Sequence, residues 1–278
     1  MPTPKGLGQI PVPESAGKAA GEAAGLDRRQ LTAVGKALRL LAAFRHAGPS
    51  VSLGVLAARA HMPKSTTFRL LTDLEGAGFV ERAGADYRLG LSLFELGSRV
   101  DFNRPQGLRE VAMHDMCHLY VQAGLPVHLA VLSGSQIVYV ETLRKPESRR
   151  VLDVPGARAA ASPTALGKAI LAFRAPQDIR VVAEGGLVRE TPHSITSPSR
   201  FIDELKQVRS SGIAFEREER ALGLAAVAAP IVFDGQAIAS VAVSGPTGSV
   251  NWTALGAKVK ATAASITTSY ERAMHNLH

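Results

Sequence analysis

Three short helical patterns followed closely by a β-hairpin pattern constrain the N-terminal part of this chain more than any other feature. Apolar residues recur every three or four positions from Leu31 to Phe44, which predicts an amphipathic helix. The pair Gly48-Pro49 then ends this helix. Ser52 is suited to cap a second helix that runs through His61, because a serine oxygen can accept a bond from an unpaired amide of the first turn.

A third helix is expected to start at Pro63, since proline at the first helical position loses no hydrogen bond. Its predicted buried stripe comprises Leu70, Leu71 and Leu74. Two glycines end this helix, and strand patterns follow at residues 79–82 and 87–89 around a glycine-containing turn. Helix, helix, helix and hairpin in this order, with a short link between the second and third helices, predict a winged helix-turn-helix over residues 29–90.

The start of the third helix carries the residue types that DNA recognition needs. Small hydroxyl side chains there let the backbone approach a groove wall and donate to phosphates, while Arg69 can reach a phosphate or a guanine edge. Phe68 has two interpretations, contact with thymine methyl groups or packing against the hairpin. The alternative for the whole segment is helix capping by Ser65 and Thr66 with an ordinary solvated Arg69. The candidate DNA-contacting residues are Ser52, Lys64, Ser65, Thr66, Thr67, Phe68, Arg69, Arg82 and Arg88.

The charge distribution agrees with a polyanionic partner without establishing one. The formal net charge is +8 and the isoelectric point about 9.9. Residues 1–104 hold 14 basic and 9 acidic side chains, so most of the excess lies in the N-terminal part. Mixed surface charge is normal for solvated proteins, and the charge alone therefore adds only modest support for nucleic-acid binding.

Composition also limits where the chain acts and how its parts are joined. Residues 1–28 are rich in proline and glycine, which predicts a disordered tail. No stretch reaches the ~20 apolar residues of a membrane span, the first residues contain no apolar region typical of a signal peptide, and a single cysteine, Cys117, fits a reducing compartment. We therefore expect a cytosolic protein with no membrane partner. Apolar periodicity over residues 91–104 predicts a linker helix between two domains.

The C-terminal part, residues 105–278, alternates strand and helix patterns without strict βαβ order. Helices are expected at 108–123, 162–174, 197–211 and from about 253, with strands at 127–132, 137–142, 213–218, 223–232 and 237–244. This grouping predicts an α+β domain with an antiparallel sheet.

Motifs in both halves resemble the IclR family of bacterial transcription regulators. In the N-terminal half these are Leu56-Ala57, Met62-Pro63-Lys64-Ser65-Thr66-Thr67-Phe68-Arg69-Leu70-Leu71, Leu74-Glu75 and Gly78-Phe79-Val80. Downstream they are Thr164-Ala165-Leu166-Gly167-Lys168-Ala169, Gly212-Ile213-Ala214, Glu218-Glu219, Gly223, Ala228-Ala229-Pro230-Ile231 and Val243-Ser244-Gly245-Pro246. The resemblance covers about residues 31–275. The resemblance implies a homodimer or homotetramer that binds a palindromic DNA operator. It also implies a GAF-like domain that binds a small-molecule effector.

The resemblance also implies an effector pocket at the edge of the sheet. Amides of the turn Ala165-Leu166-Gly167 would receive a carboxylate, and two alanines stand where acid-binding relatives place polar residues. We therefore expect a roomier, more apolar pocket and an effector with an aromatic or alkyl body carrying one carboxylate or carbonyl, with no metal or other cofactor. The candidate pocket residues are His128, Ser162, Thr164, Ala165, Leu166, Gly167, Glu216, Ala226, Ala242 and Ser244. A purely structural role is the alternative for His128.

Several other patterns allow different chemistry. His114 and His118 stand one helical turn apart with Cys117 between them, and Ser133-Gly134-Ser135 contains serines, so a hydrolase or metal-dependent enzyme with an accessory DNA-binding module is the alternative function. The glutamate of the zinc-protease motif and the strand–elbow–helix context of a hydrolase serine are missing. Cys117 is expected in the core and the run 216–220 on a solvated face. The favoured function is a repressor of a catabolic operon, and not an enzyme.

Overall fold

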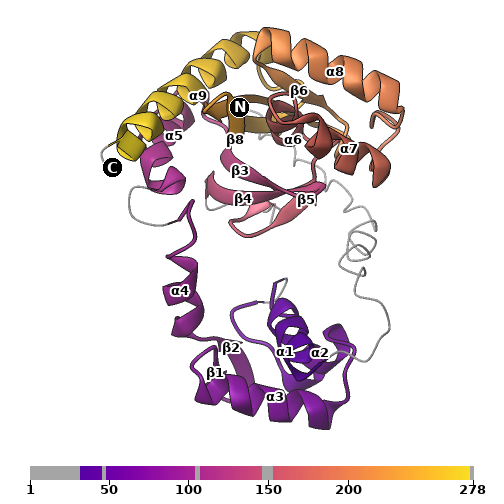
Figure 1. Cartoon of the computed structure of the whole chain (residues 1–278), viewed down its shortest axis with the longest axis vertical. Coiled ribbons are helices and arrows are strands. Elements are labelled where there is room, and N and C mark those ends of the chain that lie inside the picture. The colour runs from indigo at the N-terminus through magenta and orange to yellow at the C-terminus, as the bar shows by residue number, and fades with distance from the viewer. Residues whose placement is uncertain (1–31, 46–47, 104–106, 146–152, 276–278) are drawn as a thin grey trace, which may run out of the picture.

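The computed structural model describes residues 32–45, 48–103, 107–145 and 153–275. The predicted tail at residues 1–28 lies outside these ranges, as does the expected end of the linker helix at Arg104. The N-terminal elements are α1 (Ala33–Ala42), α2 (Leu53–Arg59), α3 (Lys64–Gly76), β1 (Val80–Ala83), β2 (Asp86–Leu89) and α4 (Leu91–Gly97). Figure 1 shows the first five as one body at the end of the molecule, with α4 leading away from it toward the second body.

The N-terminal body is a winged helix-turn-helix. Capping works as expected at α2, where the Ser52 side chain accepts a bond from the Val55 amide at 3.4 Å. The two wing strands pair antiparallel, with Val80 opposite Leu89 and Ala83 opposite Asp86, so only two residues form the turn. Buried side chains from all three helices and the wing form one core: Leu40, Phe44, Val51, Leu56, Ala60, Leu70, Leu71, Val80 and Tyr87.

Two helix boundaries differ from the prediction. Pro63 is the residue before α3, since its ψ of 144° is extended, and its carbonyl accepts the Thr67 amide. The linker helix α4 stops at Gly97, well before residue 104. Beyond it, the carbonyl of Gly97 accepts the Asn103 side-chain amide at 3.1 Å, and turns replace the helix.

The C-terminal body is built on one six-stranded sheet. Its strand order is β5-β4-β3-β8-β7-β6, and every neighbouring pair is antiparallel. The strands are β3 (Val127–Ser133), β4 (Gln136–Leu143), β5 (Arg158–Ala160), β6 (Ala214–Arg217), β7 (Leu224–Phe233) and β8 (Gln236–Pro246). The predicted antiparallel α+β domain is therefore confirmed, with β5 as a strand that the sequence analysis did not predict.

Helices cover both faces of this sheet (Figure 1). They are α5 (Leu108–Ala123), α6 (Ala165–Leu171), α7 (Pro176–Glu184), α8 (Pro198–Ser211) and α9 (Trp252–His275). Strand β7 contributes side chains to the cores on both faces of the sheet, because alternate side chains point to opposite faces. Ala226 and Ala228 pack in the core under α6 and α8, whereas Val227 and Ile231 pack in the core under α5 and α9.

Helix lengths in this body follow the capping residues. Helix α8 begins with Pro198 and ends before Gly212, whose φ of 73° is left-handed, as predicted. Helix α6 is shorter than the predicted 162–174, because the Thr164 side chain caps it by accepting the Gly167 amide. Helix α7 was not predicted.

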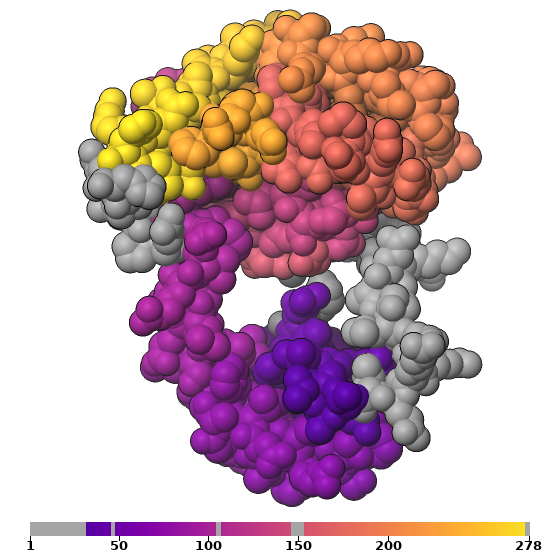
Figure 2. Space-filling view, viewed as in Figure 1, coloured from indigo at the N-terminus to yellow at the C-terminus, as the bar shows by residue number. Residues whose placement is uncertain are grey.

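Two surface observations complete the fold. Cys117, expected in the core, is exposed on α5, because the buried face of that helix is formed by neighbouring positions such as Met116 and Leu119. Among the described helices, none combines the length and apolar character that crossing a bilayer requires. Figure 2 shows the two bodies as separate masses connected along one side by the segment that contains α4.

Candidate functional site

Helix α3 has one buried and one exposed face. Leu70 and Leu71 are buried against the N-terminal core, and their burial orients the opposite face outward. The outward face carries exposed Lys64, Ser65 and Arg69. The ion pairs among the described residues involve neither Lys64 nor Arg69, so both cations remain available to an anionic partner.

The structure excludes one predicted DNA contact. Thr67 is 0% exposed, and its hydroxyl donates to the Pro63 carbonyl at 3.0 Å. Its side chain therefore belongs to the core of the helix-turn-helix and cannot reach a groove. Thr66 is half-buried, and Ser52 is an exposed residue whose oxygen already caps α2.

Arginines of the wing are partly engaged within the protein. Arg82 lies over the Tyr87 ring, with its guanidinium carbon 5.0 Å from the ring centroid, and its Nε lies 3.6 Å from Oε2 of Glu75. Phe68 is 47% exposed and also lies under Arg82 at 5.9 Å, so the structure combines the two interpretations of this side chain, wing packing and exposure. Arg88 pairs with Glu81 across the hairpin at 2.7 Å.

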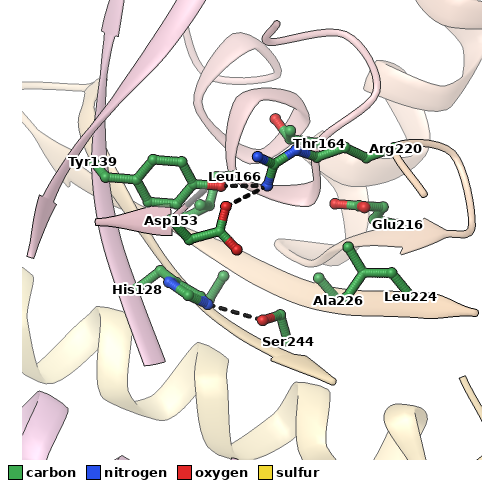
Figure 3. Close-up of a pocket in the computed structure, with 11 residues that line it drawn as sticks. His128, Tyr139, Asp153, Thr164, Leu166, Glu216, Arg220, Leu224, Ala226 and Ser244 are labelled. Carbon is green, nitrogen blue, oxygen red and sulfur yellow. Dashed lines mark hydrogen bonds and ion pairs between the residues drawn. The ribbon is translucent and has the colours of Figure 1, made fainter. Parts of the chain in front are cut away.

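A second candidate site is a pocket between the sheet and the start of α6 (Figure 3). It is lined by His128, Tyr139, Asp153, Thr164, Leu166, Glu216, Arg220, Leu224, Ala226, Ala242 and Ser244. Seven of these were predicted, whereas Ser162, Ala165 and Gly167 are buried behind the lining. The cavity volume is about 10 Å³, roughly what one water molecule needs, so a larger ligand requires the lining to move apart.

Sheet register explains why distant residues meet at this pocket. Glu216 on β6 is directly opposite Ala226 on β7, which is opposite Ser244 on β8. His128 on β3 is opposite Ala242 on β8 in the adjacent row. Because side chains directly opposite one another share a face, these two rows form the floor of the pocket.

His128 is held as a neutral ring by two hydroxyl groups. The Thr142 hydroxyl donates to the Asp153 carbonyl at 2.6 Å, so it can only accept from Nδ1 of His128 at 3.2 Å. Nε2 must then accept from the Ser244 hydroxyl at 2.8 Å. Burial lowers the pKa of His128 to about 4, which agrees with a neutral ring that orients Ser244 in the pocket.

Glu216 has the least satisfied side chain in the pocket. Its Oε2 accepts the Ala165 amide at 3.4 Å, while its Oε1 is buried with no hydrogen-bond partner. Burial raises the pKa of Glu216 to about 7, although the positive charge of Arg220 limits the rise. The expected carboxylate-binding turn at the start of α6 is thus largely occupied, since Glu216 takes the Ala165 amide and Thr164 takes the Gly167 amide.

Three polar pocket residues were missed by the sequence analysis. Arg220 donates from Nη1 to the Tyr139 hydroxyl at 2.8 Å and to Asp153 Oδ1 at 2.7 Å. Burial alone would raise the pKa of Asp153, but the adjacent Arg220 guanidinium outweighs it and the pKa is lowered. The prediction that the run 216–220 is a solvated face is therefore wrong for Glu216, Glu219 and Arg220, which point inward.

The polar cluster changes the expected character of the pocket. Ala226 and Ala242 line it as predicted, and Leu224 lies beside Ala226 on the apolar side (Figure 3). The opposite side carries the ion pair of Arg220 and Asp153 together with Tyr139 (Figure 3). The pocket is consequently two-sided, with an apolar side and a charged side, and is less apolar than the two alanines indicated.

Residues of the alternative enzyme function are not assembled into a site. His114 and His118 are exposed on α5, and Ser135 lies in the two-residue turn between β3 and β4. Within the described residues, no group of three or more metal-binding side chains comes together.

Family models match both bodies of the chain. The IclR helix-turn-helix domain matches residues 33–84, and the C-terminal domain of the bacterial transcriptional regulator IclR matches residues 104–268. Both models describe parts of transcriptional regulators, and the enzyme alternative is not favoured.

Individual relatives agree with the family models. The HTH-type transcriptional regulator BhcR of Paracoccus denitrificans is 33% identical over 239 residues, which cover 83% of this chain and 84% of the relative. The transcriptional repressor IclR of Escherichia coli is 28% identical over 270 residues, covering 94% and 97%.

Solved structures share the fold. The Thermotoga maritima IclR structure has a TM-score of 0.69 at 28% identity and covers 85% of this chain and 98% of its own. An IclR homologue from Microbacterium hydrocarbonoxydans, complexed with 4-hydroxybenzoate, has a TM-score of 0.78 at 22% identity and covers 87% and 100%.

Proposed function

This chain belongs to the IclR family of bacterial transcriptional regulators, and we propose that it represses a catabolic operon under the control of a small organic effector. The observation that carries the proposal is the outward face of α3, where exposed hydroxyl and cationic side chains project from a helix-turn-helix. A separate body holds an internal pocket, so operator binding and effector sensing occupy different parts of one chain. A protein that acts on the bacterial chromosome works in the cytoplasm.

The DNA interface that we propose places α3 in the major groove. Arg69 reads a guanine edge or a phosphate, while Lys64 and Ser65 position the start of the helix on the backbone. Arg82, Arg88 and the wing follow the adjacent phosphates, and Ser52 contacts the backbone from the start of α2. Thr66 and Phe68 supply the remaining contacts, and Thr67 supports the helix from within.

We further propose that the protein binds a palindromic operator as a homodimer or a pair of dimers. One recognition helix buries too little surface for physiological specificity, and a twofold pair doubles the contact. Support comes from exposed apolar side chains on two separate helices of the N-terminal half: Val34 and Leu38 on α1, and Leu91, Phe94 and Leu96 on α4. Exposed apolar groups on a helix are available for protein–protein contacts.

The effector is an organic acid with an aromatic or alkyl part that occupies the pocket beside α6. The apolar side of the pocket accommodates the body of such a molecule, and the charged side accommodates its polar end. The complex of an IclR homologue with 4-hydroxybenzoate provides a precedent for this class of compound in the same fold. Effector binding changes operator affinity only if the two DNA-binding states bind the effector unequally.

Operator binding by Arg69→Ala tests the regulator function. The wild-type protein should protect a twofold-symmetric sequence upstream of its own or a neighbouring gene in a footprint. Arg69→Ala should weaken binding to that duplex by about 1–3 kcal/mol, or roughly ten- to a hundredfold, at fixed salt. Arg200→Ala, which removes an exposed arginine from the distant helix α8, serves as the matched control and should bind like the wild type. Equal competition by unrelated duplex, or a footprint without twofold symmetry, would refute the proposal.

A further inference from the structure

We propose that the effector is a hydroxy acid, whose carboxylate binds the guanidinium of Arg220 and whose hydroxyl group donates a hydrogen bond to Oε1 of Glu216. The inference rests on the proposed effector role of the pocket and adds a ligand class and two residues that discriminate among ligands. Three features of the described residues carry it, namely the geometry of Arg220, the engaged amides of α6 and the unpartnered oxygen of Glu216.

Arg220 is the cation best placed for an acid in this pocket. Its side chain is only 13% exposed, and it enters the lining from the segment after β6 (Figure 3). Both of its hydrogen bonds to Tyr139 and Asp153 start from Nη1. A guanidinium has five N–H donors in a planar fork, so the donors of Nη2 and Nε are left for another planar acceptor such as a carboxylate.

The alternative anion site at the start of α6 is a poor competitor. The Ala165 amide donates to Glu216 and the Gly167 amide to Thr164. Helix α6 also has only seven residues, so the partial charge at its start is small compared with a guanidinium. An acid that enters the pocket therefore gains more from Arg220.

Glu216 determines what else the effector must carry. Its Oε1 is buried without a partner, and its carboxylate points into the space bordered by Arg220 and Leu224 (Figure 3). A buried acceptor without a hydrogen bond is costly, and a ligand hydroxyl would satisfy it. A ligand without a hydroxyl group would leave this oxygen unsatisfied.

The two requirements fix the orientation of the effector. Its carboxylate lies on the side of Arg220 and Tyr139, its hydroxyl faces Glu216, and its hydrocarbon part lies along Leu224, Ala226 and Ala242. His128 keeps the Ser244 hydroxyl directed away from the ligand, since that hydroxyl donates to the ring. Ser244 can then offer only an acceptor to the effector.

Calorimetry on the full-length protein with matched pairs of acids tests the inference. The probes are 4-hydroxybenzoate against benzoate and lactate against propionate, together with the primary amide of each hydroxy acid. In at least one pair the hydroxy acid should bind about tenfold or more tightly than its deoxy partner, since the site otherwise leaves a buried acceptor unsatisfied.

Substitutions at Arg220 and Glu216 test which ligand group each residue binds. Arg220→Gln should weaken binding of the hydroxy acid by about tenfold or more and leave binding of its amide nearly unchanged. Glu216→Leu should keep binding of the acid but remove most of the preference for the hydroxyl group, because leucine offers no acceptor. Arg217→Gln, the same change at an exposed arginine of β6, is the matched control and should bind like the wild type.

A double variant separates the loss of the Arg220 guanidinium from loss of folding. Arg220→Gln alone leaves Asp153 buried without its ion pair, so Arg220→Gln with Asp153→Asn removes both charges and should show the same loss of acid binding. Equal affinities within both pairs, acid binding that survives both Arg220 variants, or failure of all four acids to bind would overturn the inference. Operator footprinting in the absence of effector tests the proposed regulator function separately.

Discussion

Burial moves the pKa values of two pocket side chains in directions that have opposite consequences for stability. His128 has its pKa lowered to about 4, so the native state resists protonation and the protein loses stability as the pH falls from about 6.5 toward 4. Glu216 has its pKa raised to about 7, so the native state holds a proton that the unfolded chain releases near 4.5. Stability attributable to Glu216 is therefore present at low pH and lost as the pH rises toward 7.

The first residue-scale prediction concerns Glu216→Gln. The wild-type free energy of unfolding should fall relative to the variant by about 2–3 kcal/mol between pH 5 and pH 8, because the variant has no proton to lose at this position. Urea unfolding at pH 5, 6, 7 and 8 measures the difference. Glu184→Gln, which changes an exposed carboxylate of α7, is the control. The same pH dependence in both variants would show that ionisation of Glu216 is not responsible.

Individual functional residues were only partly predictable from the sequence. Motif positions such as Glu216, Ala226 and Ser244 were correctly placed in the pocket, since a family motif retains the register of its strands. Arg220 was missed because it stands in a run of charges, and only the alternation of β6 and the turn after it direct that side chain inward. Thr67 was misassigned because a hydroxyl early in a helix fits DNA contact and a buried backbone bond equally well.

At the scale of elements, α6 is held very close to the chain that precedes it. A Cβ atom added at Gly167 would lie 2.1 Å from the Ala161 carbonyl oxygen and 2.5 Å from its Cα. Both contacts are with backbone, which cannot move aside as a flexible side chain can. Glycine at this position therefore allows α6 to approach Ala161 and brings Thr164 and Leu166 to the pocket.

The element-scale prediction follows from that contact. Gly167→Ala should lower the free energy of unfolding of the C-terminal body by about 1–3 kcal/mol, because the overpacked methyl group forces α6 away from Ala161. It should also weaken effector binding by displacing Thr164 and Leu166. Chemical unfolding and calorimetry measure the two effects.

A second helical glycine provides the control for this prediction. A Cβ atom at Gly97 in α4 meets nothing within 4 Å, so Gly97→Ala should leave stability unchanged or slightly raised. Equal effects of the two substitutions would contradict the steric explanation for Gly167.

Most elements were predictable because their patterns are long or well capped. Helix α8 combines Pro198 at its start with Gly212 at its end, and α1 has apolar residues at every third or fourth position. Strand β5 has three residues, too few for a period to be read, and α7 buries only Val182. The early end of α4 depends on the side chain of Asn103 and on turns that a periodic pattern does not indicate.

The whole molecule separates DNA reading from effector sensing, with α4 between the two bodies (Figure 1). This helix buries no residue in the monomer, although it is rich in apolar side chains. Leu91 is 63% exposed and Phe94 70% exposed. If α4 packs against its twofold mate, it fixes the distance between two recognition helices, and the effector bodies can alter that distance.

The whole-molecule prediction uses the double variant Leu91→Ser, Phe94→Ser. We expect it to bind a duplex with a single half-site as well as the wild type does, since α3 is untouched. On the full palindrome it should lose about tenfold or more, because the second recognition helix is no longer held at the required spacing. Fluorescence anisotropy at fixed salt measures both affinities, and sedimentation reports the oligomeric state.

Val121→Ser, at a side chain 80% exposed on α5, is the control and should bind the full palindrome more tightly than the half-site by the same factor as the wild type. If the α4 variant kept the wild-type ratio of the affinities for the full palindrome and the half-site, another part of the chain would set the spacing of the recognition helices.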